Sequence, residues 1–158
     1  MIKNKYHIQI LLVITLFSFY SCSSMTAFTK SKVDNSTRTF SADIYRDIMG
    51  VPHIFGKTDA DAVFGLAYAH AEDDFKTIQD LLLGARGMLG EKYGVKFSPV
   101  DYYVELIGVW EDINNRYDDE IPENIKLICE AYAQGINKYA FEHQQEIENE
   151  LFPIKGKD

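Results

Sequence analysis

Residues 46–56 read RDIMGVPHIFG and combine a charged pair, a glycine and a histidine inside an apolar stretch. A histidine acts as a general acid or base when a neighbouring group orients its ring, and Asp47 would lie across a hairpin from His53. A histidine base also needs a nucleophile to activate, and the sequence offers no obvious serine or cysteine for this role. We therefore expect a structural histidine that is hydrogen-bonded within the hairpin, with a catalytic histidine as the alternative.

A second polar group is HAEDD, which runs from His70 to Asp74. On a helix, His70 shares a face with Asp73 or Asp74, and imidazole and carboxylate groups are metal ligands. Neither a second histidine nor another such cluster lies near in the sequence. We expect solvated acids beside a half-buried histidine, and we assign no metal ligand to this chain.

Arg86 lies among the glycines of residues 84–94, GARGMLGEKYG. An arginine can bind a carboxylate through two parallel hydrogen bonds, so Arg86 is a candidate contact for a substrate. The alternative, which we favour, is a packing role in which Arg86 pairs with Glu91 or Asp101.

The short motifs of many active sites are missing from the sequence, namely a nucleophile elbow, a phosphate-binding loop, CxxC and HExxH. Cys129, one of two cysteines, falls on an apolar helical stripe, so we expect a buried structural thiol and not a nucleophile. No residue of this chain is therefore predicted to be catalytic.

The elements that position these groups are a hairpin and about three helices, an α+β fold. Alternation in ADIYRD predicts one strand and PHIF a second, with Gly50 in the turn and Pro52 at the strand start. The first helix is predicted to begin at a capping box at Thr58, to become irregular in the glycines of residues 84–94 and to end at Gly94. A second helix is predicted over residues 101–117, and a third from Pro122 onward.

Each predicted helix carries an apolar stripe at helical spacing. The inward residues are expected to be Phe64, Tyr68, Ala71, Phe75, Ile78 and Leu82 on the first helix, Val104, Ile107, Trp110 and Ile113 on the second, and Ile125, Ile128, Cys129, Tyr132, Ile136 and Tyr139 on the third. A lone hairpin and these stripes need more partner surface than the chain supplies. We expect part of the core to lie beyond Asp158.

Composition places the chain among globular proteins, since 46% of its 158 residues are hydrophobic and 13% are aromatic. The formal net charge is −8 and no basic stripe is visible, so we do not expect a nucleic-acid partner.

The N-terminus has the layout of a secretory signal, with two early lysines and an apolar run from Ile8 to Tyr20. Ser21 before Cys22 resembles a bacterial lipoprotein signal, which implies cleavage before Cys22 and a lipid on its thiol. An uncleaved anchor, or a plain signal cut nearby, is the alternative. We thus expect a signal peptide at 1–21, a tether at 22–41 and a domain at 42–158, exported and lipid-anchored on the periplasmic side of a bacterial membrane.

Three ordered motifs resemble the start of the α-subunit in the penicillin acylase family, the N-terminal-nucleophile amidohydrolases that include cephalosporin acylases and acyl-homoserine-lactone acylases. They are RDxxGVPHI at 46–54, FGLAYAHAEDD at 64–74 and ARGMLGEKYG at 85–94, and ICEAYAQGINKY at 128–139 matches a later helix. Many relatives carry arginine at the place of Asp74. The resemblance covers roughly residues 42–152 and implies a fragment of an αββα fold.

The resemblance also implies a mechanism. A precursor cuts itself, and the new N-terminal serine of the β-subunit attacks an acyl–amine amide bond with its own α-amine as base. That serine, the oxyanion hole and most metal ligands lie in the β-subunit, so calcium would belong to the full-length enzyme. Arg46, Asp47, Gly50, Pro52 and His53 then carry over as scaffold only, and the chain would be inactive without its missing β-subunit.

The competing class is a non-catalytic lipoprotein, a remnant or binding module that keeps the acylase scaffold. The DNA downstream separates the two hypotheses, because only the first requires a following β-subunit.

Overall fold

The structure, a computed structural model, describes residues 39–148 and 150–158. The predicted signal peptide, Cys22 and residues 22–38 of the predicted tether lie outside the described residues. Phe40 is buried against Ala60 and Ala131, so the described fold includes a residue that precedes the predicted boundary at 42.

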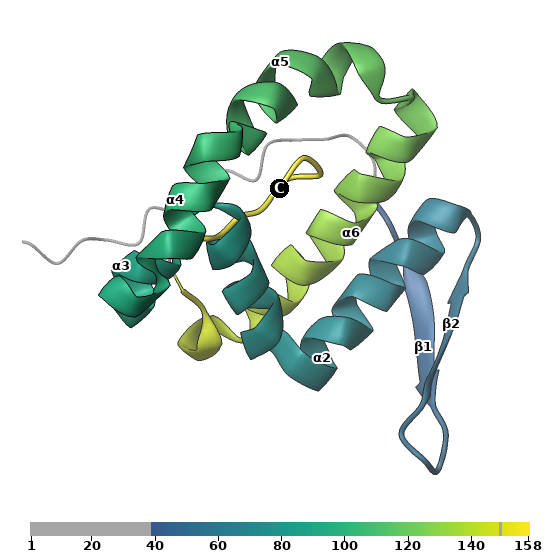
Figure 1. The fold of residues 1–158 in the computed structure, drawn as a ribbon. Coiled ribbons are helices and arrows are strands. Elements are labelled where there is room, and N and C mark those ends of the chain that lie inside the picture. The colour runs from purple at the N-terminus through teal and green to yellow at the C-terminus, as the bar shows by residue number, and fades with distance from the viewer. Residues whose placement is uncertain (1–38, 149) are drawn as a thin grey trace, which may run out of the picture. The chain divides into compact units, whose positions relative to one another are not determined.

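The two strands form the predicted antiparallel hairpin (Figure 1), with β1 at Ala42–Arg46 and β2 at Pro52–Gly56. Ile44 lies opposite Ile54, and Arg46 lies opposite Pro52. The inner face of the hairpin packs on the first long helix, where a Cβ added at Gly65 would lie 2.7 Å from the Ala42 Cβ. Only a glycine lets the strands approach the helix this closely.

The first long helix, α2, spans Asp59–Ala85 and begins with the predicted capping box. Thr58 accepts a hydrogen bond from the Asp61 N–H at 3.2 Å, and the Asp61 carboxylate accepts one from the Thr58 N–H at 3.1 Å. The helix is kinked at Asp74, whose backbone is not helical, with φ −157° and ψ 67°. The sequence pattern predicted an unbroken helix here.

The core lies between α2 and the last long helix, α6, at Glu123–Glu142. Pro122 lies at the N-cap of α6, one residue before the first helical position at which the sequence predicted it, and its side chain makes no capping bond. Buried residues that line this core from the two helices are Ala67, Ala71, Phe75, Ala133, Ile136, Tyr139 and Ala140. Ala67 and Ala71, four residues apart, share the face of α2 that packs on α6, whereas Ala69 shares a face with Gly65, which packs against the hairpin.

Three short helices connect α2 to α6: α3 at Leu89–Tyr93, α4 at Ser98–Ile107 and α5 at Val109–Glu120, with a 3₁₀ turn (η1) at Val95–Phe97. Gly94 ends α3 as predicted. The predicted helix over 101–117 is instead two helices, because Gly108 takes a left-handed conformation with φ +66° between α4 and α5.

Two predicted inward residues point outward. Ile107 is 52% exposed, because the bend at Gly108 ends the helical register on which its stripe was extrapolated. Ile125 is 42% exposed and lies in the first turn of α6, ahead of the residues of that helix that pack into the core. The other stripe residues of α6 are buried or half-buried, as predicted.

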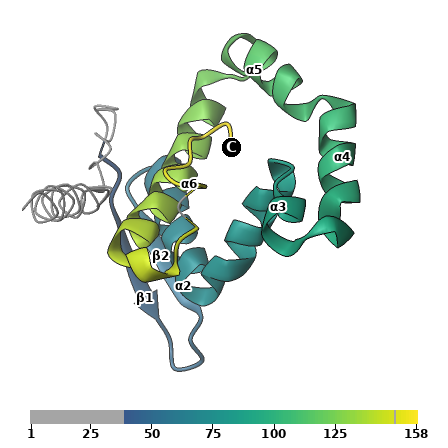
Figure 2. The same cartoon turned by 90° about the vertical axis from the view of Figure 1, so that its left-hand side faces the viewer.

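The C-terminal segment returns along the core after a second 3₁₀ turn (η2) at Gln144–Glu146. Leu151 and Ile154 are buried, and the Asn137 side chain makes two hydrogen bonds to the Ile154 backbone, at 2.7 and 2.9 Å. Figure 2 shows this segment running beside α6. None of the helices in the described ranges is long and apolar enough to cross a bilayer.

Candidate functional site: the hairpin–helix junction

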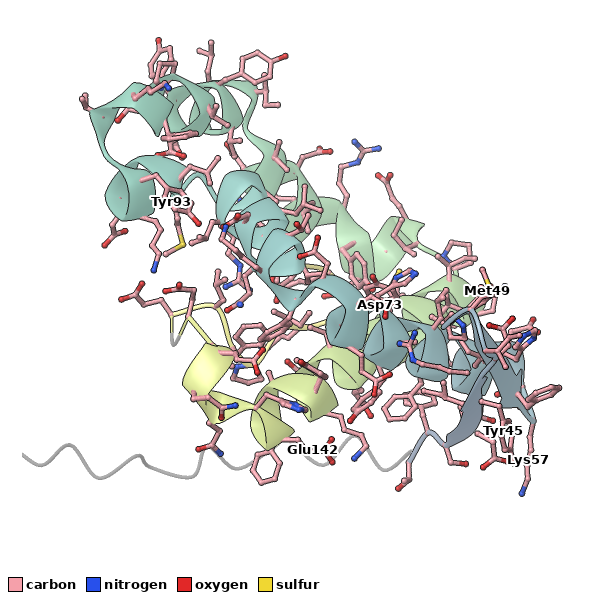
Figure 3. The ribbon with its side chains drawn as sticks, turned by 90° about the horizontal axis from the view of Figure 1, so that it is seen from below. Tyr45, Met49, Lys57, Asp73, Tyr93 and Glu142 are labelled. Carbon is pink, nitrogen blue, oxygen red and sulfur yellow. The ribbon has the colours of Figure 1, made fainter. Side chains whose placement is uncertain are left out.

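Arg46 joins the hairpin to α2. Its guanidinium donates to the Gly50 carbonyl in the turn at 2.8 Å and to the Ala69 carbonyl on α2 at 3.3 Å. The same group lies 3.0 Å from Glu72 and 2.9 Å from Asp73, and hydrogen bonds to these two carboxylates raise the pKa of Arg46. Figure 3 labels Asp73 on α2 and Met49 in the hairpin turn, the two segments that Arg46 connects.

Asp47 organises the turn itself. Its carboxylate accepts hydrogen bonds from the backbone N–H groups of Met49, at 2.8 Å, and Val51, at 3.0 Å. The bonds from Val51 and Met49 lower the pKa of Asp47. Gly50 has φ +83° with open space around its Cα, so the backbone conformation, and not crowding, calls for glycine.

His53 lies beside Asp47, as the sequence predicted. Its Nε2 is 3.5 Å from the Asp47 carboxylate, which is long for a hydrogen bond, and its side chain is 56% exposed. Across the hairpin His53 pairs with Tyr45. The imidazole therefore lies on the outer face of the hairpin, beside Asp47 and opposite Tyr45.

The acids of HAEDD serve two structural purposes that the sequence reasoning missed. Glu72 and Asp73 bind Arg46. Asp74 caps the second half of α2, since its carboxylate accepts from the Thr77 N–H at 3.1 Å and from the Thr77 hydroxyl at 2.6 Å. Asp74 followed three residues later by Thr77 is a spacing typical of a helix start, so the sequence did carry a signal for this cap.

His70 is exposed, not half-buried, and its Nδ1 lies 3.2 Å from the Tyr132 hydroxyl. Within residues 39–148 and 150–158, no three side chains of His, Cys, Asp or Glu gather as a metal site would require.

Arg86 has a packing position, but its predicted partners are wrong. The guanidinium donates to the Leu151 carbonyl at 3.1 Å and pairs with Asp158 at 3.0 Å, both on the C-terminal segment. Asp101 instead caps α3, where it accepts from the N–H groups of Leu89 and Gly90 at 2.9 and 2.6 Å.

Cys129 is half-buried on α6, and not fully buried as the apolar stripe predicted. Burial raises the pKa of the neighbouring Tyr117. This packed environment is that of a structural thiol.

The Gly135-Ile136-Asn137 step, in the matched stretch at 128–139, is explained by packing. A Cβ added at Gly135 would lie 2.4 Å from the Phe64 carbonyl oxygen and 2.7 Å from the Ala67 Cβ, so glycine permits the close crossing of α2 and α6. Ile136 is fully buried, and Asn137 holds the C-terminal segment. Each residue of the motif thus supports a different contact of the core.

A surface depression of about 520 Å³ lies at the junction of α4 and α5 and not at the matched motifs. It is lined by Ile107, Val109 and Ile113 together with Glu111 and Asp112. The motif residues therefore fix the hairpin, the kinked helix and the helix crossing, and they do not line this depression.

Comparison with known proteins assigns the family. The family model for penicillin amidase matches residues 41–155. The acyl-homoserine lactone acylase QuiP of Pseudomonas fluorescens (strain Pf0-1) is 31% identical over 108 residues, which are 68% of this chain and 13% of QuiP. The penicillin acylase 2 proenzyme of Pseudomonas sp. (strain SE83) is 28% identical over 96 residues, which are 61% of this chain and 12% of that protein.

The acyl-homoserine lactone acylase PvdQ of Pseudomonas fluorescens (strain Pf0-1) is 26% identical over 113 residues, covering 66% of this chain and 14% of PvdQ. The chain thus spans about an eighth of the length of these relatives. The fold resembles the thermostable penicillin G acylase from Alcaligenes faecalis, with a TM-score of 0.60 and 19% identity over 76% of this chain and 68% of that chain. With a family match over most of its length and the hairpin–helix fold of a solved acylase, this chain belongs to the penicillin amidase family.

Proposed function

We propose that this chain is the N-terminal part of the α-subunit of an acylase that hydrolyses acyl–amine amide bonds, and that it supplies scaffold while a separate β-subunit supplies the nucleophile. The observation that carries the proposal is the use of the matched motif residues. Arg46, Asp47 and Gly50 are engaged with backbone groups and carboxylates of the chain itself. Such residues position elements of the fold, which fits a scaffold whose bond-breaking groups lie on another polypeptide.

Two further facts support a subunit. The solved acylase chain is comparable in length to this one, because the match covers 76% of this chain and 68% of that chain. A match of similar extent covers only 13% of QuiP. One of the relatives is named a proenzyme, which fits a precursor that is cut into parts.

The substrate class follows from the relatives as a proposal. They are named for acyl-homoserine lactones and for penicillin, and both substrates carry an acyl group on an amide nitrogen. In the proposed mechanism the N-terminal serine of the β-subunit attacks the amide carbonyl, its own α-amine takes the proton, and calcium, if the enzyme uses it, binds outside this chain. His53 has no part in this chemistry.

We further propose export and a lipid anchor at Cys22, on the basis of the N-terminal sequence. Incorporation of radiolabelled palmitate into the chain, lost in Cys22→Ser and kept in Cys129→Ser, is the expected result. Equal labelling of both variants would contradict the anchor.

The subunit proposal is tested by the DNA that follows the codon for Asp158. We expect a reading frame, in some phase, that encodes a β-subunit beginning with serine after a processing junction. Downstream DNA with no such frame would favour the competing hypothesis of a non-catalytic lipoprotein with an acylase scaffold.

A further inference from the structure

One apolar surface of the chain is formed by α4 and faces solvent. Five of the ten residues of α4 are large, apolar and at least 44% exposed. They occupy a continuous arc of the helix, here called the α4 outer face: Val100, Tyr102, Tyr103, Leu106 and Ile107. In a globular protein such an arc normally faces the core.

The body of the protein does not hold α4 by burying apolar residues, since α4 has no buried residue. Polar bonds hold its two ends instead. Asp101 caps α3, and the Trp110 indole N–H, just past the bend, donates to the Ala85 carbonyl at 2.8 Å. Because these bonds fix the orientation of α4, its apolar arc is presented outward as a defined surface.

The α4 outer face and the hairpin lie at opposite ends of the described fold (Figure 2). In Figure 3, Tyr93, at the end of α3 that leads into α4, is far from Tyr45 and Lys57 of the hairpin. About seven-eighths of the length of the relatives has no counterpart in this chain, so members of the family carry a much larger segment that is available to cover α4.

Charges around the α4 outer face restrict the choice of occupant. Glu105 and Glu111 are exposed at its border, and Lys96 is an exposed cation near its start, while the nearby Lys92 is paired with Glu148. Two copies of this acidic border would repel in a symmetric dimer, and anionic lipid would repel it as well. A protein surface that is apolar at its centre and bordered by lysine or arginine fits better.

We propose that the α4 outer face is a docking surface for the rest of the acylase, through an apolar patch with a basic border on that polypeptide. This inference rests on the proposed function, because it names the surface through which the proposed β-subunit is bound.

The test uses the 158-residue chain and, as probe, the polypeptide of Pseudomonas fluorescens QuiP from which the segment matching this chain is removed. Binding is measured by titration calorimetry or co-purification for the wild-type chain, Leu106→Ser and Leu81→Ser. Leu106 is 64% exposed on the α4 outer face, and Leu81 is 68% exposed on α2, so the two variants are matched in type and exposure. Circular dichroism checks that both fold.

We expect Leu106→Ser to weaken binding about tenfold or more, Leu81→Ser to leave it unchanged, and affinity to fall as salt is raised. Equal binding by both variants would overturn the docking surface and leave the subunit proposal standing. No binding by the wild-type chain would count against both. A homodimer, or adhesion to phosphatidylglycerol vesicles, that is lost in Leu106→Ser would overturn the inference in favour of that other occupant.

Discussion

The crossing of α2 and α6 makes one substitution decisive, Gly135→Ala. The new Cβ would lie 2.4 Å from the Phe64 carbonyl oxygen and 2.7 Å from the Ala67 Cβ. Contacts between non-bonded atoms are normally about 3.5 Å, so the helices must separate by roughly 1 Å. The carbonyl belongs to the backbone of α2 and cannot rotate away as a side chain would.

Two effects oppose each other in this variant. Replacing glycine by alanine inside a helix stabilises it by about 1 kcal/mol. Overpacking a close-packed core costs about 1–3 kcal/mol, and here the separation also loosens Ala67 and Ile136, which are fully buried. We expect the clash to exceed the propensity gain, with a net loss of about 1–2 kcal/mol in the free energy of unfolding.

Gly84→Ala is the matched control, because Gly84 also lies in a helix but its added Cβ would meet only the Leu89 side chain, at 3.4 Å. Urea unfolding followed by circular dichroism should show a midpoint lowered by about 0.5–1 M for Gly135→Ala. Gly84→Ala should match or exceed the wild type. An unchanged or raised midpoint for Gly135→Ala would refute the close crossing of the helices.

Three further variants test other contacts. Asn137→Ala should lower the free energy of unfolding by about 2 kcal/mol in urea titrations, since it leaves the two backbone groups of Ile154 unpaired; a loss below a few tenths would mean that the C-terminal segment is not held there. Asp74→Ala should lower the thermal midpoint at neutral pH. Because Thr77 lowers the pKa of Asp74, this difference from wild type should vanish as pH falls well below 3.8, and persistence in acid would contradict the cap. Burial, with a hydrogen bond to Glu142, raises the pKa of Tyr68 to about 12, so wild-type stability relative to Tyr68→Phe should decline as pH rises from 10 through about 12; a constant difference in alkaline urea titrations would contradict it.

The hairpin and the first helix start could be predicted because their signals are local. Gly50, Pro52 and the Thr58–Asp61 capping box act through backbone geometry within a few residues, and each has its predicted place in the structure. The α6 stripe was recognisable for the same reason, because one helix carries it without a break.

The ion pairs between residues far apart in the chain could not be predicted from the sequence. Arg46 pairs with Glu72 and Asp73, which lie more than twenty residues away in the sequence. Arg86 pairs with Asp158, although Glu91 and Asp101 are nearer to it in the sequence. An arginine can pair with any of the acidic residues in a sequence. Only the packing of α2, the hairpin and the C-terminal segment determines which acid lies beside it. Gly108 shows the same limit, since a glycine inside a helical pattern is often tolerated, yet here it bends the chain.

The central claim, that the bond-breaking groups belong to another polypeptide, is tested most directly by amide hydrolysis. The purified 158-residue chain should release no amine from penicillin G or from a panel of N-acyl-homoserine lactones. Release of amine by that chain alone, lost on heat denaturation, would contradict the account.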